Sequence, residues 1–135
     1  MEARFLLDTN ICIYIRRKKP DPVLQRFRAL KQGEAALSVI ILGELLYGAE
    51  KSAQLAAALE LLRELAQALS VMGLPETAAE AYGTMRAELE RKGQMIGNTD
   101  LWIAAHAKAA GLTLVTNKER EFRHVPGLKM QNWAL

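Results

Sequence analysis

Short apolar runs alternate along this chain with longer stretches whose apolar residues recur at helical spacing. The first apolar run, residues 5–7, stops abruptly at Asp8, and helical spacing then continues from Asn10 to about Arg17. A short apolar run bounded by turn-forming residues is typical of a strand buried within a parallel sheet. We therefore expect a strand over residues 4–7 that leads directly into a helix, with a carboxylate at the junction.

The same alternation continues to the carboxyl end of the chain. Further strands are expected over residues 35–38 and 112–115 and near the carboxyl end, with a short apolar piece over 69–72. Helices are expected over residues 21–31, 39–52, 53–68, 75–93 and 98–110. Asn98 or Thr99 can cap the last helix, and Gly111 can supply its left-handed C-terminal residue. Strands that alternate with helices form a mainly parallel sheet with helices on both faces, so the pattern predicts one α/β domain over residues 1–135.

Composition narrows the class of protein without indicating a function. Half of the 135 residues are apolar, which is enough for a folded core, and the net charge of +3 permits a polyanionic partner without demonstrating one. The single Cys12 lies in an apolar stretch, which is typical of a small buried hydrophobe in a reducing compartment. No apolar stretch approaches the roughly 20 residues of a membrane span. We therefore expect a cytoplasmic protein without membrane association.

Asp8 is the first of three acids that stand where acids are unfavourable. In open α/β sheets the ligand crevice lies beyond the carboxyl ends of the strands, and Asp8 follows the first expected strand at that edge. The alternative is that Asp8 only caps the following helix, as Asp, Thr and Asn commonly do. The sequence leaves both interpretations open.

Glu44 is the second acid, and it lies in the middle of an apolar stretch. Between residues 35 and 49 the polar side chains beside Glu44 are the hydroxyl of Ser38 and the phenol of Tyr47. We therefore expect the surrounding helix to be largely buried, where an ionised carboxylate is unfavourable unless it is paired or bound to a metal. The alternative is a salt bridge to one of the arginines.

Asp100 is the third acid, in the first turn of the helix expected to begin near Asn98. First-turn acids commonly do no more than interact with the positive end of a helix, and for Asp100 alone that interpretation is preferred. The three acids taken together favour a metal site instead, because converging carboxylates repel one another unless a cation lies between them. Divalent magnesium or manganese would turn such a cluster into a binding site.

Five phrases of the sequence together resemble the PIN-domain ribonucleases, specifically the VapC-type toxins of bacterial toxin–antitoxin systems. In chain order they are FLLDTNICIYI, LSVIILGELLYGAEKS, AYGTMRAELERKGQMIGNTDLWIAAHAKAAG, LTLVTNKEREFRHVPGL and QNW. Each phrase alone is a weak signal, whereas all of them in this order are highly specific. The resemblance implies a three-layer α/β/α PIN-like fold with a central, mainly parallel sheet of four or five strands.

The resemblance also implies roles for individual residues. Asp8, Glu44 and Asp100 match the three acids that act in the family as catalytic metal ligands, and Thr9 matches a hydroxyl that often accompanies the first acid. Relatives often have Asn or Asp where Lys118 stands here, so a fourth ligand position is left open. The auxiliary candidates for it are Asn117, Glu119 and Glu121. The implied cofactor is Mg²⁺, with Mn²⁺ as a second choice, because hard cations prefer oxygen ligands.

The activity implied by the resemblance is endonucleolytic hydrolysis of RNA, such as a transfer RNA, by metal-activated water. The implied partners are an antitoxin protein and a second copy of the chain, in a homodimer and in a higher hetero-oligomer with the antitoxin. Two alternatives stay open. One is a catalytically silent PIN-like binding module, and the other is an aspartyl phosphoryl-transfer domain, although Asn10 stands where such a domain needs its second carboxylate.

Positive charge must flank an acidic pocket that accepts RNA. The candidates are Arg16, Arg17, Lys18 and Lys19, with Arg86 and Lys92 later in the chain. Such residues more often form a solvated face, and that alternative stays open for each of them. No spacing links His106 and His124 as metal ligands, so we do not expect a histidine site.

Overall fold

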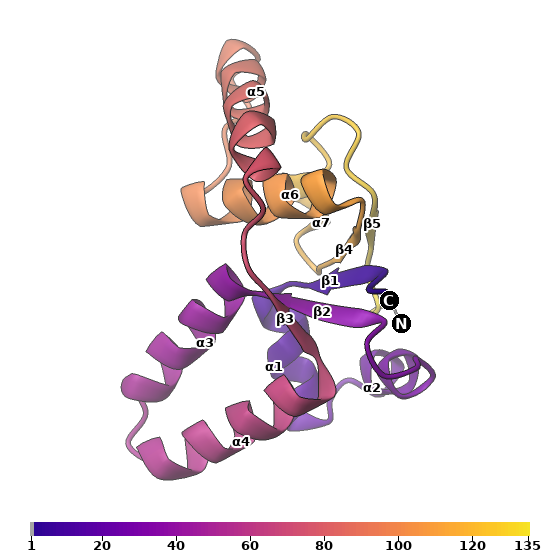
Figure 1. Cartoon of the computed structure of the whole chain (residues 1–135), viewed down its shortest axis with the longest axis vertical. Helices are drawn as coiled ribbons and strands as arrows, with labels where there is room; N and C mark the ends of the chain where they lie inside the picture. The colour runs from indigo at the N-terminus through magenta and orange to yellow at the C-terminus, as the bar shows by residue number, and fades with distance from the viewer. Residues whose placement is uncertain (1) are drawn as a thin grey trace.

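Five short strands form one sheet in the computed structural model of this chain, which describes residues 2–135 (Figure 1). The strands are β1 (Phe5–Leu7), β2 (Ala35–Ser38), β3 (Ser70–Met72), β4 (Thr113–Val115) and β5 (Met130–Gln131). Their order across the sheet is β3-β2-β1-β4-β5, and every neighbouring pair is parallel. The expectation of four or five mainly parallel strands is therefore confirmed, with five strands that are all parallel.

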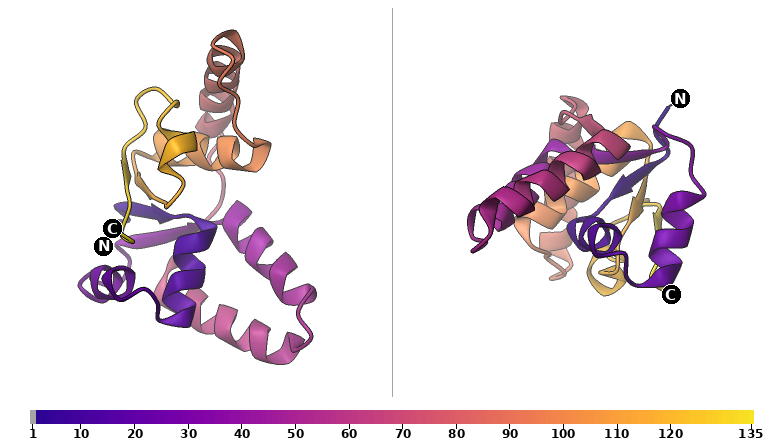
Figure 2. Two further views of the ribbon diagram at one scale, coloured as in Figure 1. Left: turned by 180° about the vertical axis from the view of Figure 1, so that it is seen from behind. Right: turned by 90° about the horizontal axis from the view of Figure 1, so that it is seen from below.

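Helices cover both faces of this sheet. They are α1 (Thr9–Arg17), α2 (Asp21–Arg28), α3 (Val39–Glu50), α4 (Leu55–Ala68), α5 (Thr77–Arg91), α6 (Asn98–Ala110) and the short α7 (Glu119–Phe122). In Figure 1, α1, α2 and α4 lie on one side of the sheet and α5 and α6 on the other, which confirms the three-layer arrangement. Figure 2 shows that α3 leads away from the sheet and that α4 returns to it. No helix among residues 2–135 has the length and apolar character to cross a membrane.

Several helix ends differ from the sequence expectation. The helix α2 ends at Arg28 rather than near residue 31, and α3 ends at Glu50. The expected side-chain cap of α6 is wrong, because Gly97 occupies the N-cap position and makes no side-chain hydrogen bond there. Gly111 does end α6 in the left-handed conformation, with φ of 69°. A residue without Cβ adopts that conformation at little cost, which explains the glycine.

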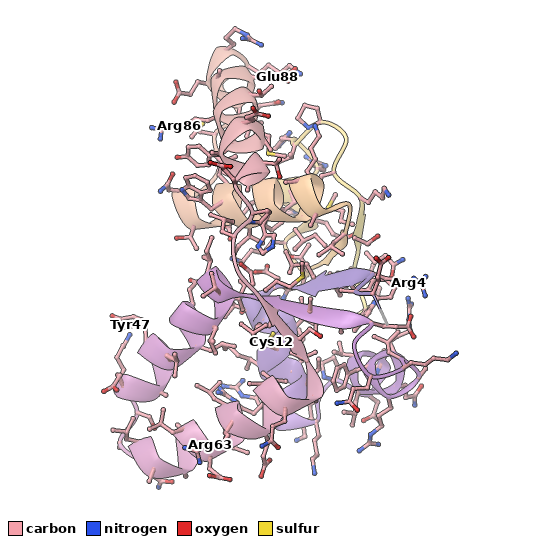
Figure 3. All side chains as sticks on the ribbon, viewed as in Figure 1. Arg4, Cys12, Tyr47, Arg63, Arg86 and Glu88 are labelled. Atoms are coloured by element: carbon pink, nitrogen blue, oxygen red, sulfur yellow. The ribbon has the colours of Figure 1, made fainter. Side chains whose placement is uncertain are left out.

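The core lies between the two helical layers and the central strands. The strands β1 and β2 are buried along their whole length, and β4 is buried over its last two residues, because helices cover both of their faces. Cys12 is fully buried in this core, in agreement with its expected role (Figure 3). Burial raises the pKa of the Cys12 thiol, so the side chain is an inert hydrophobe rather than a reactive thiolate.

The register of the sheet brings the polar residues that follow two strands, β1 and β4, to one edge. Leu7 is paired with Val115, and Leu6 is paired with Ala36. The residues that follow β1 and β4 therefore lie side by side, at the carboxyl edge where β2 also ends. Asp8 and Thr116 lie there, and both are buried. The ligand crevice of an open parallel sheet is found at this edge.

A buried polar pair joins the end of β2 to α6. Ser38 caps α3 by accepting a hydrogen bond of 3.2 Å from the Ile40 N–H, and its Oγ also lies 2.9 Å from Nδ1 of His106. His106 is fully buried, and its Nε2 has no hydrogen-bond partner among residues 2–135. Burial lowers the pKa of His106, because the surroundings disfavour the charged imidazolium. The ring is therefore neutral in the native protein at neutral pH.

The buried imidazole predicts a loss of stability in mild acid. Its pKa in the folded state lies below the unfolded value of about 6.5, so the unfolded chain takes up the proton first as the pH falls. The free energy of unfolding should be at its full value above that pH and should decline as the pH falls from 7.5 to 5. In His106→Gln we expect a loss of about 1–2 kcal/mol at pH 7.5 and a flatter pH dependence. Urea unfolding followed by circular dichroism at several pH values measures both, and equal slopes for the two proteins would contradict the assignment.

Candidate active site

Asp8 lies between the end of β1 and the start of α1, and only 1% of its surface is exposed. Its Oδ1 accepts a hydrogen bond of 2.8 Å from the Thr9 N–H, as an N-cap does, and its Oδ2 accepts one of 2.8 Å from the Thr116 hydroxyl. The sequence left helix capping and a place at the ligand edge as alternatives. The structure combines them, because one carboxylate makes the cap and lies at the carboxyl edge of the sheet.

The electrostatics of Asp8 connect it to other charged groups. Burial raises the pKa of the Asp8 carboxyl above its usual value, the bonds from Thr116 and Thr9 lower it, and so does the nearby Lys118 ammonium. The negative charge of Asp100 raises it further, so the two acids are close enough to repel each other. The folded surroundings therefore make the ionised form of Asp8 less favourable than it is in water.

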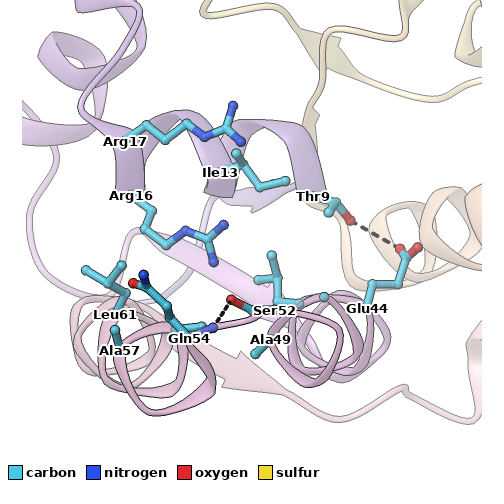
Figure 4. Close-up of a pocket in the computed structure, with 13 residues that line it drawn as sticks. Thr9, Ile13, Arg16, Arg17, Glu44, Ala49, Ser52, Gln54, Ala57 and Leu61 are labelled. Carbon is cyan, nitrogen blue, oxygen red and sulfur yellow. Dashed lines mark hydrogen bonds between the residues drawn. The ribbon is translucent and has the colours of Figure 1, made fainter.

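Thr9 connects the first acid to the second. The Thr9 hydroxyl donates a hydrogen bond of 3.1 Å to Oε1 of Glu44, across from α1 to α3 (Figure 4). Because Thr9 directly follows Asp8, this bond brings Glu44 to the same edge of the sheet. Two of the three predicted acids are therefore connected through Thr9.

The expectation that Glu44 lies in a largely buried helix is wrong. Glu44 is exposed, and α3 buries only Ile41, Leu45 and Ala49, which lie one turn apart along one side. The outer side carries exposed apolar residues such as Tyr47, which is 64% exposed and points away from the molecule (Figure 3). Apolar composition predicted burial, but in residues 2–135 no element covers the outer side of α3.

Asp100 enters from the other helical layer, in the first turn of α6, and its side chain is 14% exposed. Its two carboxylate oxygens lie 3.2 and 3.4 Å from Nζ of Lys118, which follows β4. Burial lowers the pKa of Lys118, but the charges of Asp8 and Asp100 raise it, and the net shift is upward. Lys118 is therefore a firmly charged ammonium beside two of the predicted acids.

The three predicted acids, Asp8, Glu44 and Asp100, and the auxiliary candidate Thr9 thus lie at the carboxyl edge of the sheet. No three acidic, histidine or cysteine side chains among residues 2–135 approach closely enough to enclose one metal ion in this arrangement. The Thr9 hydroxyl stands between Asp8 and Glu44, and Lys118 binds Asp100. The donors are carboxylate and hydroxyl oxygens, which fit a hard cation such as Mg²⁺ or Mn²⁺.

The auxiliary candidates differ in their surroundings. Asn117 accepts a hydrogen bond of 3.1 Å from Asn10 and donates one of 2.8 Å to the Tyr14 hydroxyl, so it ties β4 to α1. Glu119 accepts a bond from Asn132 in the carboxyl-terminal segment. Glu121 is exposed, and its charge contributes to the raised pKa of Lys118. Of the two auxiliary acids, Glu121 is therefore the one whose charge acts on Lys118 beside the acidic site.

Thr116 is a site residue that the sequence interpretation missed. Its hydroxyl holds Asp8 and accepts a hydrogen bond of 3.0 Å from the Lys118 N–H. A signal was available, because a polar residue directly after a buried parallel strand lies at the same edge as Asp8. Lys118 was noted only as a departure from the family pattern, and its contact with Asp100 was not predicted.

A cleft of about 610 Å³ opens beside Thr9 and Glu44. Figure 4 shows the Arg16 and Arg17 side chains, which extend from α1 into this cleft. Arg86 on α5 and Lys92, which follows α5, bind acids of that helix: Arg86 lies 3.0 Å from Glu90 and Lys92 lies 3.1 Å from Glu88. Of the basic candidates, Arg16 and Arg17 are therefore the ones that line the cleft.

Comparisons with known proteins agree with this architecture. The family model described as the PIN domain matches residues 5–128. The tRNA(fMet)-specific endonuclease VapC of Shigella flexneri is 42% identical over 131 residues, which cover 97% of this chain and 98% of that protein. Ribonuclease VapC2 of Haemophilus influenzae is 38% identical with the same coverage of both chains. A chain in the crystal structure of VapBC2 from Rickettsia felis bound to a promoter DNA fragment is 40% identical, with a TM-score of 0.90 over 96% of this chain and 98% of that chain.

The fold is thus that of a PIN domain. With about 40% identity over nearly its whole length, the chain belongs to the VapC ribonucleases of the PIN-domain family. The resemblance seen in the sequence is confirmed, and so is the PIN-like fold.

The buried charge of Asp8 predicts that the site reduces stability. Because the folded surroundings disfavour the ionised carboxylate, Asp8→Asn should increase the free energy of unfolding by about 1 kcal/mol at pH 7 without divalent cations. Chemical denaturation in the presence of a chelator measures the change. Glu64→Gln removes an exposed charge on α4 and should stay within about 0.5 kcal/mol of the parent. A destabilised Asp8→Asn would show that the charge is favourable where it lies.

Proposed function

We propose that Asp8, Glu44 and Asp100 are the catalytic metal ligands of this ribonuclease, and that Mg²⁺, or Mn²⁺ in its place, is the cofactor. The observation that carries the proposal is that these acids lie at the carboxyl edge of the sheet and are connected in pairs. Asp8 and Asp100 interact electrostatically, and Thr9 links Asp8 to Glu44. A bound divalent cation would lower the pKa of a water nucleophile and offset the negative charge that develops on the phosphate.

The chain's own residues hold this arrangement in place. The Thr116 hydroxyl and the Thr9 N–H keep the Asp8 carboxylate in one orientation. The Thr9 hydroxyl holds Glu44, which is exposed and would otherwise be free to turn into solvent. Thr9 and Thr116 are therefore positioning residues in this proposal, and the three acids are the groups that bind the ion.

We propose a structured RNA as the substrate, and a transfer RNA as its class. The support is the relative from Shigella flexneri, a tRNA(fMet)-specific endonuclease with 42% identity to this chain. Arg16 and Arg17 line the cleft next to Glu44 and supply positive charge for the phosphate backbone. Such a substrate implies action in the cytoplasm.

We further propose that the chain is the toxin of a toxin–antitoxin pair. The support is the VapBC2 structure from Rickettsia felis, whose matching chain covers 96% of this one and which is bound to promoter DNA. By that analogy the chain would bind an antitoxin protein, form a homodimer and join a larger complex with the antitoxin. The exposed apolar side of α3 is compatible with a protein contact of this kind.

Cleavage of RNA should depend on the divalent cation and on each of the three acids. We expect purified protein to cut transfer RNA in Mg²⁺ and not in a chelator. Asp8→Asn, Glu44→Gln and Asp100→Asn should each lower the rate at least about 100-fold, because each removes a ligand charge. Mapping of the cleavage ends, with circular dichroism to verify the fold, measures this.

Glu64→Gln is the matched control for these variants. It removes one carboxylate at the opposite edge of the sheet, beside Ala35 at the start of β2, and should cleave like the parent. Cleavage that continues in chelator would contradict the metal mechanism. Full activity of the acid variants in cells would instead indicate a catalytically silent binding module.

The two cleft arginines should contribute to RNA affinity through charge. In an Asp100→Asn background, which prevents cleavage, replacement of Arg16 and Arg17 by Gln should weaken RNA binding and reduce the salt slope by about 1.4, or about 0.7 for each lost contact. Fluorescence anisotropy at several salt concentrations measures both. The control with Arg28 and Arg91 replaced by Gln has the same net charge and should keep the parent slope. Equal slopes for both double variants would exclude the cleft as the RNA path.

A further inference from the structure

Lys118 occupies an unusual place for a basic side chain. It follows β4, and its ammonium lies 3.2 and 3.4 Å from the two carboxylate oxygens of Asp100. The charge of Asp8 also acts on it. The positive group of one residue therefore lies beside two of the three acids that we assign to the metal.

An ammonium and a divalent cation cannot share these oxygens without strong repulsion. Divalent ions bind carboxylate oxygens at about 2.0–2.6 Å, and both oxygens of Asp100 already face Nζ of Lys118. Two positive charges a few ångströms apart at a partly buried site repel each other with an energy that is large compared with thermal energy. One cation must therefore leave Asp100 when the other binds.

Lys118 is able to move away from Asp100. Its side chain is 32% exposed, compared with 14% for Asp100, so a path to solvent is open. A lysine holds its partner as a point charge on a flexible stem and lacks the planar fork by which arginine grips a carboxylate. The contact with Asp100 is one that a competing cation can break.

We propose that Lys118 is a built-in counter-cation of the acidic site, which neutralises Asp8 and Asp100 in the metal-free protein and must be displaced from Asp100 when a divalent cation binds. The inference rests on the proposed function. Lys118 then stabilises the metal-free fold and weakens the affinity for the metal. Both effects arise because the Lys118 ammonium neutralises the acids that the metal would bind.

The test measures Mn²⁺ binding to the protein without RNA. Titration calorimetry or electron paramagnetic resonance should give Lys118→Asn a Kd at least about fivefold lower than that of the parent, the lower range of coupling between two sites. Lys118→Arg keeps the charge and should bind Mn²⁺ as weakly as the parent or more weakly. Lys129→Asn removes an exposed charge at the amino edge of β4 and β5 and should leave the Kd unchanged.

Two further measurements support the test, and the second of them needs no variant. In chelator, the melting temperature of Lys118→Asn should lie below that of the parent, and Mn²⁺ should raise it more than it raises the parent's. In the parent protein, Mg²⁺ should increase the acylation of the Lys118 amine by an amine-reactive reagent. Mass spectrometry measures the extent of acylation of Lys118 relative to that of Lys129. Unchanged acylation of Lys118 at saturating metal would overturn the displacement.

The outcomes separate this inference from the proposed function. If parent and Lys118→Asn bind Mn²⁺ with equal Kd, the counter-cation role is wrong and the metal site stands. If neither protein binds Mn²⁺, and Asp100→Asn behaves like both, the metal site itself is wrong and the inference falls with it.

Discussion

Asp8 carries a charge at a point where the core meets the carboxyl edge of the sheet, and water scarcely reaches it. Burial opposes that charge, whereas Thr116, the Thr9 N–H and Lys118 favour it. These partners are in reach because β1 and β4 are parallel and in register, so the residues that follow them lie together. The position of Asp8 in turn determines where Thr9 presents its hydroxyl, and through it where Glu44 is held. The site is thus a direct consequence of strand register.

The local sequence pattern predicts much of this architecture. Buried strands appear as short apolar runs, helices appear as periodic stretches, and their alternation predicts a parallel sheet between two helical layers. Asp8 was predictable as an edge residue because it follows the first of these runs. Thr116 follows another and could have been predicted by the same reasoning. The ends of the helices were less predictable, since Gly97 rather than a side-chain cap precedes α6.

Other features depend on distances that no local pattern encodes. An apolar helix within the core and an apolar helix with one uncovered side have the same composition, which is why Glu44 was expected to be buried and is exposed. The contact between Lys118 and Asp100 joins residues 18 positions apart on different elements. Whether a lysine after β4 reaches an acid on α6 depends on the packing of that helix against the sheet. Sequence showed that Lys118 departs from the family pattern, but not what it touches.

A site made of acids faces two opposing requirements. Without a cation, carboxylates at one edge repel one another and lower the stability of the fold, and Asp8 pays an additional desolvation penalty. With a cation, the same charges give affinity, and any group that neutralised them beforehand weakens binding. A neutral residue at position 118 would favour affinity for the cation, whereas a lysine favours stability of the fold without a cation. In the metal site that we propose, the ammonium beside Asp100 therefore favours a stable metal-free protein, in which the acids stay together before an ion binds.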